Sequence, residues 1–273
     1  AGEQSSETLN RMQIDAGHIE TVLLTHFHSD HIGGLGSINL QRWIAQGERP
    51  AMKVFGPPGV ERVVNGLNEA YALDSSYRTA HHGSDVAQPA TSAMIAEEFG
   101  LPAGEESKVV LEDDGLKVTT FVVDHSPVEP AVGFRFDYKG RSAVISGDTV
   151  YAPPLVKASK GADLLVHDAL SRGLLKLVED AAGNAGLDKR QQILADIWDY
   201  HATPQEAARA AAEAGVGALA LTHIVPPLPL KGLEGPFLGD TRKRFSGPLW
   251  LANDGDLYSL PADGSDLKRT SLI

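Results

Sequence analysis

The chain contains no cysteine, which excludes disulfide bridges and thiolate metal ligands. It also has no apolar run that approaches the roughly 20 residues of a membrane span, and no signal peptide is visible. Cations are in the minority, since 24 Lys and Arg stand against 36 Asp and Glu and give a formal net charge of −12. This balance disfavours general affinity for nucleic acids and anionic membranes, although bound dications would offset part of it locally.

The chain does have the composition and pattern of a globular α/β protein. Hydrophobic residues make up 42% of it, enough for a sizeable core. Strand-like and helical patterns alternate without an internal repeat, so we expect a single domain over 1–273. Strands are expected at 20–25, 108–111, 116–124, 131–138, 142–147, 163–167, 217–222, 248–251 and 256–260. Helices are expected at 5–15, from the loop near 34 to about Gln46, after a strand and turn at 53–59, and near 91–99. Residues 74–107 show little periodicity and are expected to form a long surface insertion near the mouth of the active site.

Residues with side chains that can bind metal are most concentrated in residues 23–34, LLTHFHSDHIGG. His26, His28, Asp30 and His31 follow an apolar run and precede Gly33-Gly34, so the pattern predicts a loop between a buried strand and a helix. Four polar side chains of this kind in six positions are typical of a metal site. Nitrogen and oxygen donors without thiolates suit zinc, with manganese and iron as alternatives.

Further donors lie at the ends of other predicted strands. His125 follows VTTFVVD, Asp148 ends AVISGD, His223 follows ALALT, and His201 lies just before a predicted helix. Strand ends on one edge of a sheet converge, so these groups can meet in one cleft. A single histidine in such a place is more often structural than a ligand, but the joint pattern indicates a metal centre.

The motifs THFHSDH, SGDT and LTHI, with His125 between them, resemble the metallo-β-lactamase superfamily. The segments GPPG, LLVHDAL and YHATPQEAARAA are similar to its ribonuclease Z-like branch. This resemblance implies an αββα sandwich that holds two metal ions. It implies that His26, His28 and His125 hold one ion, that Asp30, His31 and His223 hold the other, and that Asp148 bridges them.

The resemblance also implies a hydrolase mechanism. A hydroxide bridging the two metals and oriented by Asp30 would attack the ester. His201 would protonate the leaving group and Asp168 would orient His201, as the corresponding histidine and glutamate do in that branch. That branch carries a His-Glu-Ala-Thr loop and a His-Ser-Thr loop at these places. This sequence has Asp168 in place of the Glu and Ala202 in place of the Ser. A capping or packing role is the alternative for His201, and His167 is interpreted as structural.

The substrate is expected to be a small anionic ester. True tRNA-processing members carry a long arm between the third ligand position and the bridging aspartate, whereas 22 residues separate His125 from Asp148 here. Together with the net charge of −12, this disfavours tRNA. A phosphodiester is the leading hypothesis and an aryl sulfate the second. A lactone, thioester or β-lactam substrate, or a non-catalytic metal-binding role, are further alternatives.

The remaining expectations concern the ends and the surface of the chain. AGEQSSETLNRM resembles a segment that the family places after its first strands, so the first sheet is expected to lack those strands. A periplasmic location is an alternative to a cytoplasmic one if an export signal has been removed, and a homodimer is expected by analogy only. The sequence leaves open whether His81 and His82 line the substrate mouth. Trp43 and Trp198 are expected in the core.

Overall fold

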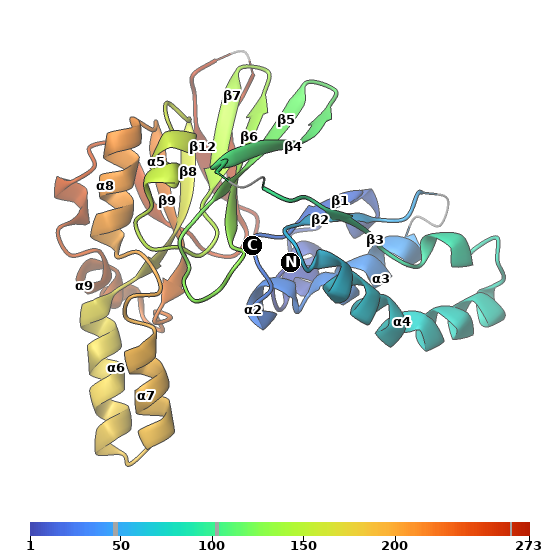
Figure 1. Ribbon diagram of the computed structural model, residues 1–273, viewed down its shortest axis with the longest axis horizontal. Helices are drawn as coiled ribbons and strands as arrows, with labels where there is room; N and C mark the ends of the chain where they lie inside the picture. The colour runs from blue at the N-terminus through green and yellow to red at the C-terminus, as the bar shows by residue number, and fades with distance from the viewer. Residues whose placement is uncertain (46–48, 102–103, 263) are drawn as a thin grey trace. The chain divides into compact units, whose positions relative to one another are not determined.

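The computed structural model describes residues 1–45, 49–101, 104–262 and 264–273, and the chain divides into two compact units (Figure 1). The first unit comprises Ala1–Gly100, Asp254–Leu257 and Thr270–Ile273. The second comprises Leu101–Asn253 and Tyr258–Arg269. The grouping of all 273 residues into one hydrolase domain stays a prediction.

The first unit is built on a three-stranded parallel sheet in the order β1-β2-β3. Its strands are β1 Thr21–Leu23, β2 Lys53–Gly56 and β3 Ile95–Glu98. Its helical segments are α1 Ser5–Arg11, η1 Ala16–His18, α2 Ser29–Ile32, α3 Leu35–Ala45, α4 Val60–His82 and η2 Pro89–Thr91, where η denotes a 3₁₀ helix. The core of this unit consists of Leu24, Leu35, Ile38, Met52, Val54, Val60, Val64 and Met94.

The expectation of little regular structure in the first part of residues 74–107 is wrong, and the assignment of this stretch as an insertion near the mouth of the active site stays a prediction. Helix α4 continues to His82, because the stretch from Val60 contains no proline, and only Val60 and Val64 of this helix are buried. A helix that is mostly solvated shows little hydrophobic periodicity, which is why the sequence pattern missed its second half. The helix expected at 91–99 is also wrong, since Ile95–Glu98 pairs in parallel with β2 and takes its strand geometry from that partner. The predicted end of the preceding helix at Gln46 lies outside the described residues.

The second unit is built on a seven-stranded sheet in the order β10-β9-β8-β7-β6-β5-β4. Strands β4 to β7 pair antiparallel, and β7 to β10 pair in parallel. The strands are β4 Ser107–Asp113, β5 Leu116–Val122, β6 Val132–Tyr138, β7 Arg141–Ile145, β8 Leu164–Leu170, β9 Ala218–Val225 and β10 Leu249–Leu251. The predicted strands of this region are therefore present, with shifted ends. A separate two-stranded sheet pairs β11 Asp256–Ser259 with β12 Lys268–Ser271.

Helix α8, Pro204–Ala214, covers strands β8 and β9 of the second unit. Thr203 and Glu206 form a capping box at its start, and Gly215 ends it in the left-handed conformation. Its small alanine side chains allow close packing on the sheet and are buried with Leu165, Leu219 and Leu221. This helix therefore fixes the loop that precedes it, which carries His201.

The other helical segments of the second unit are α5 Pro153–Ala158, α6 Arg172–Asn184, α7 Asp188–Asp196, η3 Lys231–Leu233, α9 Glu234–Leu238 and η4 Thr241–Lys243. Helices α6 and α7 lie side by side and extend away from the sheet of this unit (Figure 1). Among the residues that the structure describes, no helix combines the length and the apolar character required to cross a bilayer.

The two tryptophans that were expected in the core differ in their surroundings. Trp43 is 1% exposed and donates its indole N–H to the carbonyl of Gln88 at 2.9 Å, so the prediction is confirmed for this residue. Trp198 is only half-buried, and its indole N–H donates to Oε2 of Glu179 at 3.1 Å. This bond links the end of α7 to α6, and the predicted core position of Trp198 is wrong because solvent reaches part of its side chain.

Candidate active site

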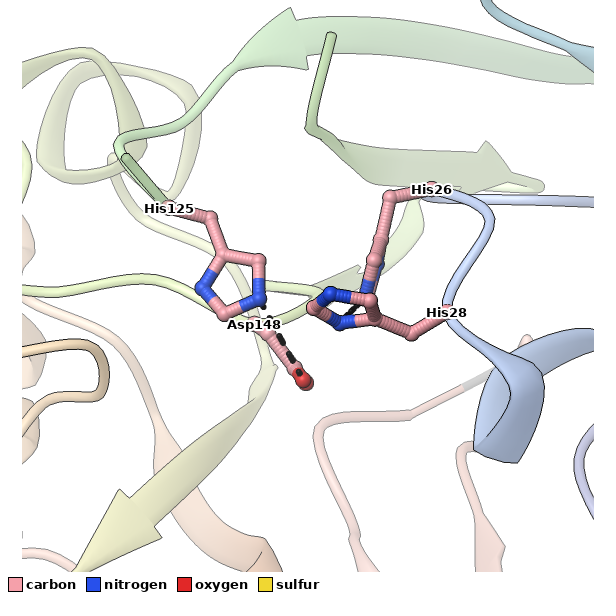
Figure 2. A group of neighbouring side chains, drawn as sticks. All are labelled: His26, His28, His125 and Asp148. Carbon is pink, nitrogen blue, oxygen red and sulfur yellow. Dashed lines mark hydrogen bonds and ion pairs between the residues drawn. The ribbon is translucent and has the colours of Figure 1, made fainter. Parts of the chain in front are cut away.

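In the first unit, the histidine motif begins on the loop that joins β1 to α2. Leu24, which is 2% exposed, anchors the start of this loop by donating its N–H to Phe55 of the neighbouring strand. His26 is fully buried, and its Nε2 lies 3.1 Å from Nδ1 of His28 (Figure 2). The Nδ1 atom of His26 lies 3.1 Å from the hydroxyl of Thr25. Two imidazole nitrogens that approach this closely are placed to share one ligand.

The other two residues of the motif lie on the short helix α2. The Nε2 atom of His31 lies 3.4 Å from Oδ2 of Asp30, whose side chain is 54% exposed. The rings of His31 and His26 have their centroids 4.2 Å apart. The first unit therefore brings all four predicted residues of the motif together.

In the second unit, His125 has a defined tautomer. It lies on the loop after β5, it is 1% exposed, and its Nδ1 lies 3.0 Å from the carbonyl oxygen of Tyr200. A carbonyl only accepts hydrogen bonds, so Nδ1 carries the proton and Nε2 presents its lone pair. That Nε2 lies 3.9 Å from Oδ2 of Asp148, which is 3% exposed and follows β7 (Figure 2). A fixed tautomer of this kind is usual for histidines that bind metal.

His223 reaches the same carboxylate because of a β-bulge in strand β9. Thr222 pairs with Asp168 and Ile224 pairs with Ala169, so His223 is an extra residue between them and has a φ of 45°. Bulges change the direction of a side chain and are common next to active sites. The Nε2 atom of His223 lies 3.4 Å from Oδ2 of Asp148.

His201 and Asp168 form a buried pair beside these ligands. Nδ1 of His201 lies 2.8 Å from Oδ2 of Asp168, and the two residues are 5% and 1% exposed. The imidazole rings of His201 and His223 are stacked with centroids 5.1 Å apart. Donor atoms of Asp148, His201 and His223 all lie within 4.8 Å of one another. The predicted proton donor is therefore next to the predicted ligands of its own unit.

The donor set fits a divalent metal ion. Imidazole nitrogens and carboxylate oxygens are the ligands that zinc and related dications take when no thiolate is present. The Asp148 carboxylate is buried next to Nε2 of His125. Burying a charged carboxylate costs free energy unless a cation or hydrogen-bond donors offset its charge. The identity and the number of the ions are matters of proposal.

Three residues to which the sequence assigned no part in the site contribute to the arrangement. Tyr200 supplies the carbonyl that fixes His125, and its ring lies 4.1 Å from that imidazole. Thr149, which is fully buried, bonds to several loops. His167, expected to be structural, places its Nδ1 2.9 Å from Oδ1 of Asp168. Tyr200 and Thr149 are themselves members of the YHAT and SGDT motifs, and this membership was their only signal in the sequence.

The three remaining histidines lie outside these groups. His81 and His82 are in the last turn of α4, with ring centroids 4.7 Å apart in an edge-on arrangement, and not on the loop that the sequence suggested. His18 is in η1, and its Nδ1 lies 3.1 Å from Oδ2 of Asp15. Among the described residues, none of these three histidines belongs to a group of three or more potential metal ligands.

Comparisons with known proteins add to this geometry. Residues 3–224 match the family model described as a beta-lactamase superfamily domain. A protein named ribonuclease Z from Mycobacterium avium is 35% identical over 243 residues, which cover 88% of this chain and 79% of that protein.

Solved structures with little sequence identity share the fold. The short form of human tRNase Z matches with a TM-score of 0.62 and 22% identity, over 93% of this chain and 83% of that one. The metallo-beta-lactamase fold protein YhfI from Bacillus subtilis matches with a TM-score of 0.60 and 17% identity, over 99% of this chain and 85% of that one.

Proposed function

We propose, from the premise that this chain belongs to the β-lactamase superfamily and is a metal-dependent hydrolase, that it cleaves phosphodiesters with two zinc ions. Family membership confirms the predicted metallo-β-lactamase fold and the likeness to ribonuclease Z. The observation that carries the proposal is the buried His201–Asp168 pair beside Asp148 and His223. A proton donor adjacent to metal ligands is what ester cleavage with a poor leaving group requires.

The proposed ligands are those that the resemblance to the superfamily implies. His26, His28 and His125 would hold one ion, and Asp30, His31 and His223 would hold the other. Asp148 would bridge them through its carboxylate. The contacts within each unit support this division, because His26 faces His28 in the first unit and Asp148 lies next to both His125 and His223 in the second. Zinc is proposed because all donors are imidazole or carboxylate, and manganese and iron remain the alternative metals.

Bound dications of this kind lower the pKa of coordinated water and neutralise charge on the phosphoryl group. The protein's own residues supply the remaining steps. Asp30, exposed and next to His31, would orient the attacking water. As the bond from phosphorus to the leaving oxygen breaks, Nε2 of His201 would deliver a proton to that oxygen. Asp168 accepts a hydrogen bond from Nδ1–H of His201 and would stabilise the imidazolium form of that residue.

Small phosphodiesters are the proposed substrate class. The net charge of −12 opposes the approach of a long polyanion such as RNA. The relative from Mycobacterium avium is named ribonuclease Z, and RNA is itself a phosphodiester. RNA is therefore the main alternative to a small phosphodiester as the substrate. The prediction that tRNA is not a substrate stays a prediction, and aryl sulfates are the second alternative.

The test is a side-by-side measurement of initial rates with the zinc-loaded chain. The substrates are bis-p-nitrophenyl phosphate, p-nitrophenyl sulfate, a chromogenic cephalosporin and a precursor tRNA with a 3′ extension. A phosphodiester rate at least a hundred times the sulfate and cephalosporin rates, with intact tRNA, would support the proposal. If sulfate hydrolysis dominates, or if the tRNA is cleaved efficiently, small phosphodiesters are not the substrate class.

A further inference from the structure

Thr149 occupies an unusual position in the second unit, directly after Asp148. It is fully buried, and each of its three polar groups bonds to a different part of the chain. Neither its hydroxyl nor its backbone is close to the solvent from which a substrate would arrive. A residue of this kind can affect a reaction only through the groups that it holds.

The hydroxyl of Thr149 holds the loop that carries His125. Its Oγ1 accepts the backbone N–H of Asp124 at 3.1 Å. Its own proton has two carbonyl acceptors, Asp124 at 3.1 Å and Val150 at 2.8 Å. The N–H of Val150 donates to the carbonyl of Asp124 at 2.9 Å and reinforces the link. The residue before His125 is thereby joined to the residue after Asp148.

The backbone of Thr149 holds the His201–Asp168 pair. Its N–H donates to Oδ2 of Asp168 at 3.3 Å, and this oxygen also accepts Nδ1 of His201 at 2.8 Å. Its carbonyl accepts the N–H of Ala202, the residue after His201, at 2.7 Å. Both members of the pair are therefore tied to the same backbone residue.

We propose that Thr149 is a positioning residue. It holds the metal ligands His125 and Asp148 in a fixed position relative to the proton-donor pair His201–Asp168. This inference rests on the proposed function for the roles of those four residues. The hydroxyl is the variable part, because every residue other than proline would supply the same backbone groups. A residue that orients ligands from outside the ligand set changes metal affinity or rate by about 10- to 100-fold when it is replaced.

The experiment compares Thr149→Val with Thr149→Ser in the full chain. Valine keeps the size and branching of threonine but removes the hydroxyl, so the N–H of Asp124 loses its acceptor. Serine keeps the hydroxyl and loses only the methyl group. The matched control is Thr120→Val, because Thr120 is also fully buried and its hydroxyl donates to the carbonyl of Gly133 at 3.2 Å within the strands of the same sheet.

Two readouts are measured for each variant. The first is zinc affinity, obtained by competition with a chromophoric chelator, and it requires no catalytic activity. The second is kcat and KM with bis-p-nitrophenyl phosphate. We expect Thr149→Val to weaken zinc binding and to lower kcat by about 10-fold or more, with KM changed less than threefold, because Thr149 does not contact the substrate. Thr149→Ser should stay within threefold of the wild type, as should Thr120→Val.

Equal behaviour of Thr149→Val and Thr120→Val would overturn the proposal. If circular dichroism shows that Thr149→Val does not fold, Thr149→Ser decides, since a tenfold loss of zinc affinity in a folded serine variant would assign the effect to the methyl group and refute the role of the hydroxyl. If the wild type binds zinc and hydrolyses no phosphodiester, the proposed function fails, and the affinity comparison still tests Thr149.

Discussion

The Nδ1 atom of His201 lies 2.8 Å from Oδ2 of Asp168, and this contact joins two residues 33 positions apart in the chain. Because Nδ1 faces the carboxylate, Nε2 is the nitrogen that can serve a substrate. In the imidazolium form the second proton is on Nε2, the nitrogen that does not face Asp168, and this is the proton that would be delivered to the leaving group. The pair thus determines which atom of His201 does chemistry.

Replacing Asp168 with asparagine tests this orientation. The amide keeps the size of the side chain but removes the negative charge that stabilises the imidazolium form of His201, so we expect kcat to fall by at least about 100-fold. The measurement is kcat on an alkyl phosphodiester, whose leaving group needs a proton, with zinc content determined in the same samples. Asp168→Glu, which preserves the charge, should recover part of the rate. A rate within twofold of the wild type for the asparagine variant would exclude the orienting role.

Replacing His201 with alanine should have an effect that depends on the leaving group. An alkoxide leaves poorly without a proton, so we expect a loss of about 10² to 10⁴ with an alkyl phosphodiester. A p-nitrophenolate leaves readily without one, so the loss on the activated ester should be within tenfold. The check is the ratio of the two losses for His201→Ala. Equal losses on both esters would indicate a binding or packing role for His201.

Removal of the metal should abolish hydrolysis and lower the thermal stability of the protein. A metal at 100 times its dissociation constant stabilises the folded state by about 2.7 kcal/mol, so a chelator should lower Tm and added zinc should restore it. His125→Ala should reduce the zinc bound per chain, measured by elemental analysis after dialysis. His18→Ala is the matched control, because His18 lies in η1 and pairs with Asp15 instead. Equal zinc content in the two variants would argue against His125 as a ligand.

The buried guanidinium of Arg42 should be important for the stability of the first unit. Arg42 is 1% exposed, and it donates to the carbonyls of Ile19 and Pro50, which precede β1 and β2. Arg42→Leu leaves both carbonyls without this donor, and we expect a loss of roughly 2–4 kcal/mol in the free energy of unfolding.

The comparison is with Arg62→Leu, since Arg62 is exposed on α4 of the same unit. Urea denaturation of both variants provides the measurement. A change below about 0.5 kcal/mol for Arg42→Leu, the range typical of surface substitutions, would show that the two carbonyls find other donors.

The sequence was sufficient to identify the metal-binding motif and the fold class. His26, His28, Asp30 and His31 are close in the chain, so their crowding is visible without a structure. His125, Asp148 and His223 each end an apolar run, and the geometry of sheets explains why such residues converge. These are properties of short segments, which local periodicity and spacing describe well.

The tertiary structure decided features that depend on partners distant in the chain. Strand β3 exists because β2 lies beside it, and the second half of α4 lacks the buried face that produces a periodic pattern. The bulge that turns His223 toward Asp148 is set by the register of β9 against β8. The links from Thr149 to Asp124, Asp168 and Ala202 likewise join residues that are 25, 19 and 53 positions apart in the chain. A hydrogen bond between such segments is fixed only when the whole sheet has formed, and for that reason the sequence specified the donors while the fold specified how they are aimed.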